Sequence, residues 1–233
     1  TGLSASDPAA VSVLSSGTNS QTFTITIIAA VTTQSVTIDA DVVNAVEQYS
    51  GRLISVSSGV NDLDIQVNAQ ATLSITSIVD LTASAPYVGG ETIDVRVNYQ
   101  NTGAVDVTNV DATIDFNGAT GVSADDPAAV IVPAGGTNSQ DFVITIVAGV
   151  STQSVTIDAD VAGAFEQYSN RVMSASSGAN DLTVQVYAQA TLLITSIVDL
   201  TAGAPYVGGE TFNIRVNYQN TGGVDVTGVD ATI

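Results

Sequence analysis

Acidic side chains are the groups in this sequence that could do chemistry. The chain has 233 residues and 23 Asp and Glu, but no His, Cys or Trp, and its four basic residues are all arginine. These absences exclude thiolate and imidazole metal sites, Ser-His and Cys-His nucleophilic pairs, lysine Schiff bases and disulfides. What remains is oxygen chemistry, either a site for a hard cation such as calcium or a pair of catalytic carboxylates.

Two sets of aspartates have a spacing that could contribute to a calcium site. Asp125 and Asp126 are adjacent, whereas Asp158 and Asp160 are two residues apart and so share one face of a strand. The sequence has no Asp-x-Asp-x-Asp-Gly loop followed by a glutamate, so the alternative is that these aspartates only solvate the surface. We therefore expect no obligatory cofactor, with calcium as the candidate ion at junctions between modules.

Catalysis by paired carboxylates is not expected. The glutamates are Glu47, Glu91, Glu166 and Glu210, and they form two pairs separated by 119 residues. Recurrence at the same place in a repeat is typical of a scaffold residue. We predict that the protein is not an enzyme.

Two tyrosines are candidates for holding a ligand on a loop. Tyr87 and Tyr206 each lie between a proline and a Gly-Gly turn, where we expect them to be exposed. An exposed aromatic ring is a common platform for a sugar. A glycan or a host surface is therefore a possible partner.

The charge of the chain excludes other partners. The net charge is -19 at pH 7, although only 12% of residues are charged. Such a surface has almost nothing with which to neutralise phosphate, so we expect no nucleic-acid partner. No run of 18 apolar residues occurs, and we expect no membrane insertion in this segment.

The sequence contains an internal repeat of 119 residues. Residues 1–114 align without gaps to residues 120–233, and 85 of these 114 positions are identical. A repeat of this kind indicates tandem copies of one structural unit, and its period alone does not say where a unit begins.

Alternation of apolar and polar residues predicts that each unit is built from β-strands. Over residues 91–99, Ile93, Val95, Val97 and Tyr99 fall on one face, and Arg96 on the other face is expected to pair with a carboxylate of a neighbouring strand. We expect an all-β fold class, with tandem immunoglobulin-like antiparallel β-sandwiches. Further strands are predicted at residues 72–81, 105–116, 129–132, 140–147, 154–161, 171–175 and 182–186.

A resemblance to a known family rests on four segments of the repeat. They are Leu73 to Leu81, Val88-Gly89-Gly90-Glu91-Thr92, Val97-Asn98-Tyr99-Gln100-Asn101-Thr102-Gly103 and, before the last strand, Asn180-Asp181-Leu182. Together they resemble the CARDB module, a cell-adhesion-related domain of bacteria and archaea, and similar prokaryotic extracellular immunoglobulin-like repeats. The resemblance implies a β-sandwich that is secreted or on the cell surface, and it brings no catalytic residues.

The strand pattern places the module boundaries out of phase with the ends of the chain. We predict a complete module over residues 71–188, the C-terminal part of a preceding module at residues 1–69, and the N-terminal strands of a following module at residues 190–233. Alone, the last segment would expose strand edges and an apolar face that soluble proteins normally cover. The residues predicted for this interface are Phe212, Ile214, Val216, Tyr218 and Leu193.

The expected partner is another copy of the chain. Residues 190–233 of one copy would complete a sandwich with residues 1–69 of the next, head to tail. Equally, the segment could be a window on a longer repeat protein whose neighbouring units make the same contacts, and both interpretations give a filament. The predicted function is that of a non-enzymatic extracellular structural protein, the repeat unit of a surface filament, stalk or adhesin shaft. The alternative is a carbohydrate- or cell-binding adhesin module with its ligand held by loops.

Overall fold

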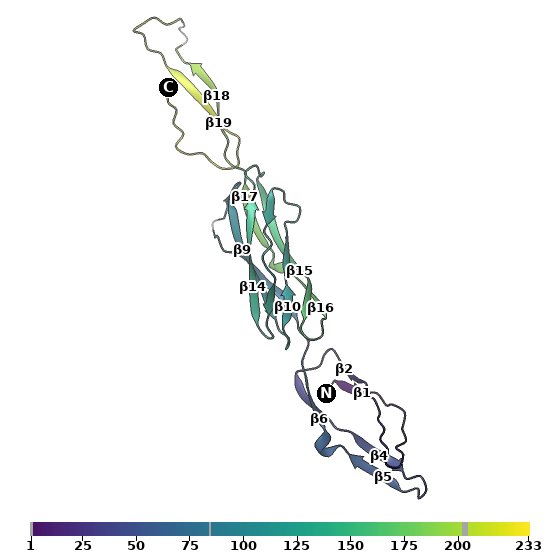
Figure 1. Ribbon diagram of the computed structural model, residues 1–233. Helices are drawn as coiled ribbons and strands as arrows, with labels where there is room; N and C mark the ends of the chain where they lie inside the picture. The colour runs from purple at the N-terminus through teal and green to yellow at the C-terminus, as the bar shows by residue number, and fades with distance from the viewer. Residues whose placement is uncertain (1, 84, 202–204) are drawn as a thin grey trace.

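The computed structural model describes residues 2–83, 85–201 and 205–233, and it has the shape of a rod (Figure 1). Three parts follow one another along its length, and the two chain termini belong to the parts at opposite ends. The regular structure of the described residues is β-strand apart from two short 3-10 helices, η1 (Gly59–Asn61) and η2 (Gly178–Asn180). The predicted all-β fold is confirmed.

The middle part, residues 71–188 and called the middle module below, is a sandwich of two sheets. One sheet has the strand order β12-β14-β9-β7. The other has the order β13-β10-β15-β17-β8, and β11 and β16 also pair with β15. The strands are β7 (Leu73–Asp80), β8 (Tyr87–Val88), β9 (Thr92–Asn101), β10 (Val107–Val110), β11 (Ala112–Asp115), β12 (Val122–Ala124), β13 (Val130–Val132), β14 (Thr137–Ile146), β15 (Gln153–Glu166), β16 (Val172–Ser176) and β17 (Leu182–Tyr187).

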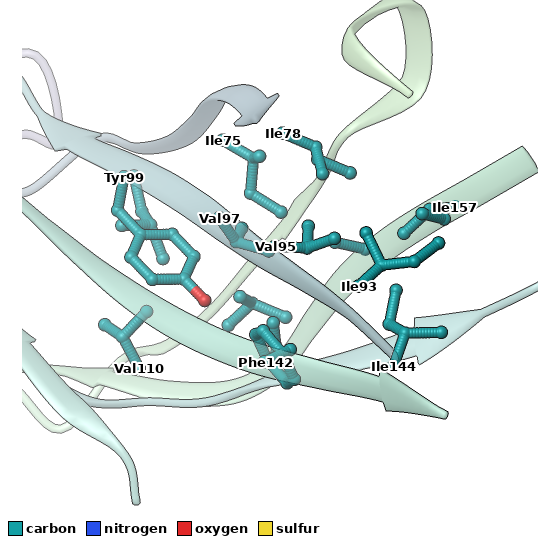
Figure 2. Close-up of a cluster of buried hydrophobic side chains, with 14 of the residues drawn as sticks. Ile75, Ile78, Ile93, Val95, Val97, Tyr99, Val110, Phe142, Ile144 and Ile157 are labelled. Atoms are coloured by element: carbon teal, nitrogen blue, oxygen red, sulfur yellow. The ribbon is translucent and has the colours of Figure 1, made fainter. Parts of the chain in front are cut away.

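The core of the middle module follows from alternation along these strands. Ile93, Val95, Val97 and Tyr99 of β9 share one face, as predicted, and each is at most 1% exposed. They pack between the two sheets with side chains such as Phe142 of β14 (Figure 2). Complete burial of one apolar side chain contributes about 1.5–3 kcal/mol, so this face contributes substantially to the stability of the core that it shares with the other strands.

The two end parts contain strand pairs and almost no core. In the N-terminal part, β1 pairs with β2, β3 with β6 and β4 with β5, while the C-terminal part contains the pair β18–β19. Among the described residues outside the middle module, only Val31 and Val67 are buried hydrophobics. The bounds are β1 (Leu3–Ala5), β2 (Ile25–Ile27), β3 (Gln34–Ile38), β4 (Asp41–Val46), β5 (Leu53–Ser57), β6 (Leu63–Val67), β18 (Leu192–Asp199) and β19 (Ile214–Asn220).

Some strands of the end parts are shorter than their repeats in the middle module. β14 spans residues 137–146, whereas its repeat β2 spans only residues 25–27. Residues 226–233 form no strand, although the equivalent residues of the middle module form β10 and β11. The cause is that the end parts lack the partner strands. In the middle module β14 pairs with β9 along its length, and β10 and β11 pair only with β13 and β15. Without a partner strand, the backbone N–H and C=O groups have only water to bind.

Candidate assembly interface

The seam of the middle module is the set of contacts between its front segment, residues 71–114, and its back segment, residues 120–188. Its longest ladder joins β9 to β14 through nine residue pairs. β10 and β11 cross the seam to β13 and β15, and β8 crosses it to β17. By the repeat, residues 190–233 correspond to the front segment and residues 1–69 to the back segment. Each end part therefore carries one side of a seam.

Apolar faces that meet at the seam are exposed in the end parts. Tyr218 is 40% exposed, whereas its equivalent in the middle module, Tyr99, is fully buried. On the other side of the seam, Phe23 is 49% exposed, whereas its equivalent Phe142 is 1% exposed. Large apolar side chains that are exposed on matching strand faces are typical of a protein–protein interface.

Four of the five residues predicted for the interface are equivalent to the core face of β9. Leu193 is the exception, because it lies opposite Gln219 in the ladder, whereas its neighbour Ile194 lies opposite Tyr218. Successive residues of a strand point to opposite faces, so Leu193 is on the other side of the β18–β19 pair from Tyr218. The prediction is corrected at this position. The four residues are Phe212, Ile214, Val216 and Tyr218.

A buried glutamine joins the two sides of the seam by hydrogen bonds. Gln140 of β14 is 3% exposed, and its Oε1 accepts from the Tyr99 hydroxyl at 2.5 Å and from the Ala112 amide at 2.9 Å. Its Nε2 donates to Asp111 Oδ1 and to the Ala128 carbonyl, both at 3.0 Å. Burial raises the pKa of Tyr99, with a smaller contribution from Asp111, so this hydroxyl stays a donor.

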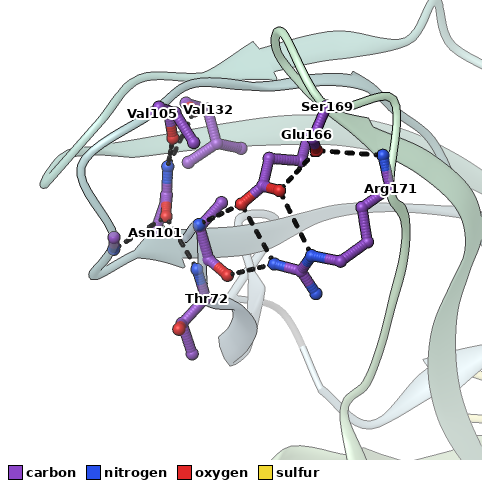
Figure 3. A network of polar contacts seen from close by, with 9 residues as sticks. Thr72, Asn101, Val105, Val132, Glu166, Ser169 and Arg171 are labelled. Carbon is purple, nitrogen blue, oxygen red and sulfur yellow. Dashed lines mark hydrogen bonds and ion pairs between the residues drawn. The ribbon is translucent and has the colours of Figure 1, made fainter. Parts of the chain in front are cut away.

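An ion pair holds the start of the front segment against the back segment (Figure 3). Glu166 accepts a hydrogen bond from the Ala71 amide, and Arg171 Nη2 donates to the Ala71 carbonyl at 2.7 Å. Arg171 Nη2 also lies 3.1 Å from Glu166 Oε1, and the Ser169 hydroxyl donates to the same carboxylate. Burial raises the pKa of Glu166, but the hydrogen bonds from Arg171, Ser169 and Ala71 outweigh it, so the pKa lies below its ordinary value.

The same pair exists in the N-terminal part without its backbone partner. Glu47 binds Arg52 at 3.3 Å and accepts from the Ser50 hydroxyl, and these hydrogen bonds lower the pKa of Glu47. The Glu47 side chain is 45% exposed, compared with 3% for Glu166. The residue equivalent to Ala71 is Ala190, which lies in the C-terminal part.

Close backbone packing at one end of the seam requires glycine. A Cβ atom at Gly89 would lie 2.7 Å from the Ala148 carbonyl oxygen, so only glycine fits there. At the equivalent Gly208, nothing lies within 4 Å of such an atom. The residue equivalent to Ala148 is Ala29, which helps to line a cavity of about 460 Å³ together with Val67 of β6.

The aspartates predicted as calcium ligands are not brought together. Asp125 Oδ1 accepts from the Val143 amide of β14, and Asp158 Oδ1 accepts from the Ser177 hydroxyl beside β15. Asp160 is exposed on β15, and Asp126 is exposed in the loop after β12. Within the described ranges, no group of three or more Asp and Glu is arranged to hold a metal ion.

Tyr87 is part of the core and not an exposed ligand platform. It is 1% exposed, its strand β8 pairs with β17, and its hydroxyl donates to Asp80 at 2.6 Å. The expectation of exposure is wrong for this residue, which cannot hold a ligand on its ring. Tyr206 donates to Asp199 at 2.5 Å and stacks on Phe212, with 4.6 Å between the ring centres.

Arg96 pairs across strands as predicted. Its guanidinium makes two hydrogen bonds of 2.7 and 2.8 Å to Asp141 of β14. These bonds raise the pKa of Arg96 and lower that of Asp141. The equivalent of Asp141 in the N-terminal part is Thr22, so Arg215 has no matching carboxylate at that repeat position.

Sequence reasoning missed the polar residues of the seam. Gln140 occupies an inward position in the alternation that continues through Phe142, Ile144 and Ile146. A polar residue in such a place is a signal of a buried hydrogen-bonded site, because burial without partners is costly. Glu166 gave no comparable signal, because its partner Ala71 is 95 residues away in the sequence.

Comparison with known protein families and with curated proteins finds no match for this chain. Among residues 2–83, 85–201 and 205–233, no helix has the length and apolar character needed to span a membrane.

Proposed function

We propose that the protein is a non-enzymatic extracellular structural protein, the repeat unit of a surface filament, stalk or adhesin shaft. Residues 190–233 of one copy complete a β-sandwich with residues 1–69 of the next copy, so that copies join head to tail. Successive copies are separate molecules or neighbouring units of a longer chain. The resemblance to cell-adhesion-related repeats supports the location outside the cell.

One observation carries this proposal: the exposed ends are the two halves of a module whose complete form is present in the same chain. The β9–β14 ladder of the middle module defines how residues 211–219 would pair with residues 18–26 of another copy. Tyr218 and Phe23 would then be buried as Tyr99 and Phe142 are.

A second copy fits better than the other end of the same chain. The two end parts lie at opposite ends of the rod with the whole middle module between them (Figure 1). Because the two surfaces differ, contact between copies is heterologous, and it propagates into a line unless a rotation closes it into a ring.

Disulfide capture tests the pairing, because the chain has no cysteine of its own. Val143 and Asp94 lie opposite each other in the β14–β9 ladder, and their repeats are Thr24 and Asn213. The Val143 amide bonds to Asp125 and the Asp94 amide to Thr82, both away from this ladder. The pair is therefore of the non-hydrogen-bonded kind, in which side chains come close enough for a disulfide.

The experiment mixes a Thr24→Cys chain with an Asn213→Cys chain under mild oxidation. We expect a covalent dimer on a non-reducing gel and filaments of the parent chain in electron micrographs. Thr183→Cys, exposed on the middle module, serves with Asn213→Cys as a control for random collision. A dimer yield no higher than this control, with a chain that sediments as a monomer at high concentration, would refute the proposal.

A further inference from the structure

The inward face of residues 21–27 in the N-terminal part carries one polar side chain, Gln21. Gln21, Phe23, Ile25 and Ile27 alternate along it, and they are the repeats of Gln140, Phe142, Ile144 and Ile146 in β14. All four of those residues are at most 3% exposed in the middle module. Gln21 itself is exposed.

Apolar alternation alone leaves the register of a strand pair incompletely defined. A slip of one residue turns every apolar side chain to the outer face, which burial forbids. A slip of two residues keeps the apolar side chains inward, so it costs much less apolar burial. An interaction other than apolar packing must therefore exclude the two-residue slip.

Gln140 supplies that selection in the middle module. It lies opposite Val97, and from there it reaches the Tyr99 hydroxyl, the Asp111 carboxylate and the Ala112 amide of the front segment. A two-residue slip would bury its amide away from these partners, and a buried polar group without partners destabilises a pairing strongly.

We propose that Gln21 sets the register between copies by binding the Tyr218 hydroxyl, the Asp230 carboxylate and the Ala231 amide of a second copy. The inference rests on the proposed head-to-tail pairing. One half of the site already exists, since Gln21 Nε2 donates to the Ala9 carbonyl at 2.9 Å, as Gln140 Nε2 donates to the Ala128 carbonyl at 3.0 Å. Tyr218, Asp230 and Ala231 are the repeats of Tyr99, Asp111 and Ala112.

Three reporter chains measure the register. Each carries one cysteine, Thr22→Cys, Thr24→Cys or Thr26→Cys, and each is mixed with an Asn213→Cys chain. Thr24 reports the native register, while Thr22 and Thr26 report slips of two residues in either direction. Directly opposite side chains are close enough to form a disulfide, but diagonal ones two residues away are not.

With Gln21 present, we expect the Thr24→Cys reporter to give at least about tenfold more dimer than either slipped reporter. Gln21→Leu keeps an inward apolar face, so chains still pair, and the ratio is expected to fall below about threefold. Thr22→Val on the outward face, tested with the Thr24→Cys and Thr26→Cys reporters, is the control and should leave the ratio unchanged. If Gln21→Leu abolishes pairing altogether, Tyr218→Phe in the Asn213→Cys chain removes only the hydroxyl that Gln21 would bind. The ratio of native to slipped dimer is then measured with that variant and is expected to fall in the same way.

The outcomes separate the two proposals. A ratio that stays near tenfold in both variants would overturn the role of Gln21 and leave head-to-tail pairing intact. If none of the three reporter chains, with no other substitution, forms a disulfide-linked dimer with the Asn213→Cys chain, the pairing itself is overturned, and with it the inference.

Discussion

At the scale of single residues, polar side chains at the seam bind backbone groups of the opposite segment. Glu166 accepts from the Ala71 amide, Arg171 donates to the Ala71 carbonyl, and Gln140 accepts from the Ala112 amide. Every buried side-chain nitrogen and oxygen of the described residues has a hydrogen-bond partner. Because these contacts need particular backbone positions, they add specificity that apolar packing does not provide.

The stability of the middle module should depend on pH through Glu166. Its pKa is lowered in the folded state, so its stabilising effect is complete above the ordinary glutamate pKa of about 4.3 and is lost as the pH falls through the folded value. Thermal unfolding of the chain, followed by circular dichroism from pH 7 to pH 2, should show a falling midpoint below about pH 4. Asp141, whose pKa is lowered by Arg96, acts in the same direction.

Replacement of Glu166 by glutamine should separate its contribution from the rest. We expect Glu166→Gln to lower the free energy of unfolding at pH 7 by about 1–3 kcal/mol and to flatten part of the pH dependence. Glu47→Gln is the matched control, because Glu47 has the same local partners but is exposed in the single chain. Equal effects of the two substitutions at a dilution that prevents assembly would contradict this prediction.

At the scale of secondary-structure elements, strands persist where their partner strand is present. In the C-terminal part, β18 and β19 remain strands because they pair with each other. Residues 226–233, the repeats of β10 and β11, have no partner strand and form no strand. The pairs that survive in the end parts are those formed within one side of the seam. Hydrogen bonding across the seam therefore accounts for the difference in strand structure between nearly identical segments in two places.

Glycine substitutions at the two equivalent turns should differ in effect. Gly89→Ala places a methyl group 2.7 Å from the Ala148 carbonyl oxygen and should lower the free energy of unfolding of the middle module by about 1–3 kcal/mol. Gly208→Ala should leave the unfolding of the dilute single chain unchanged, since nothing lies nearby.

The test compares both variants twice, by denaturant unfolding in dilute solution and by sedimentation at high concentration. Gly208→Ala is expected to weaken assembly only. Normal assembly of Gly208→Ala, under conditions in which the parent forms filaments, would show that this turn does not contact a second copy.

Local sequence pattern was enough to predict most strands and the apolar face of β9. It failed at Tyr87, because a Pro-Tyr-Val-Gly-Gly run resembles an exposed turn, while β8 in fact joins β17 through a pairing distant in sequence. It also failed at Leu193, where the register of β18 against β19 shifts between Ile194 and Ser196. The hydrogen bonds of Gln140 and Glu166 depend on segments brought together only by the fold, so no local pattern contains them.

At the scale of the whole molecule, high net charge opposes contact between copies. Each chain carries a net charge of -19, and only four arginines are available to offset it. The proposed head-to-tail joining would bring like charges together, while the apolar faces would supply the attraction.

Salt should therefore favour assembly. Raising sodium chloride from about 0.01 M to 0.5 M shortens the screening length several-fold, so the repulsion between copies weakens. We expect the critical concentration for filament formation, measured by light scattering, to fall over this range. A critical concentration that rises with salt would indicate that ion pairs between copies dominate the contact.

The separation of the two unlike half-modules to opposite ends of the rod has a directional consequence. A fibre of separate copies joined in the proposed way would be polar: one tip would present strands β1 to β6, and the other would present β18 and β19. The two tips would grow at different rates and bind different molecules. A protein that mimics a single half-module would block the addition of further copies at one tip and leave growth at the other tip unaffected.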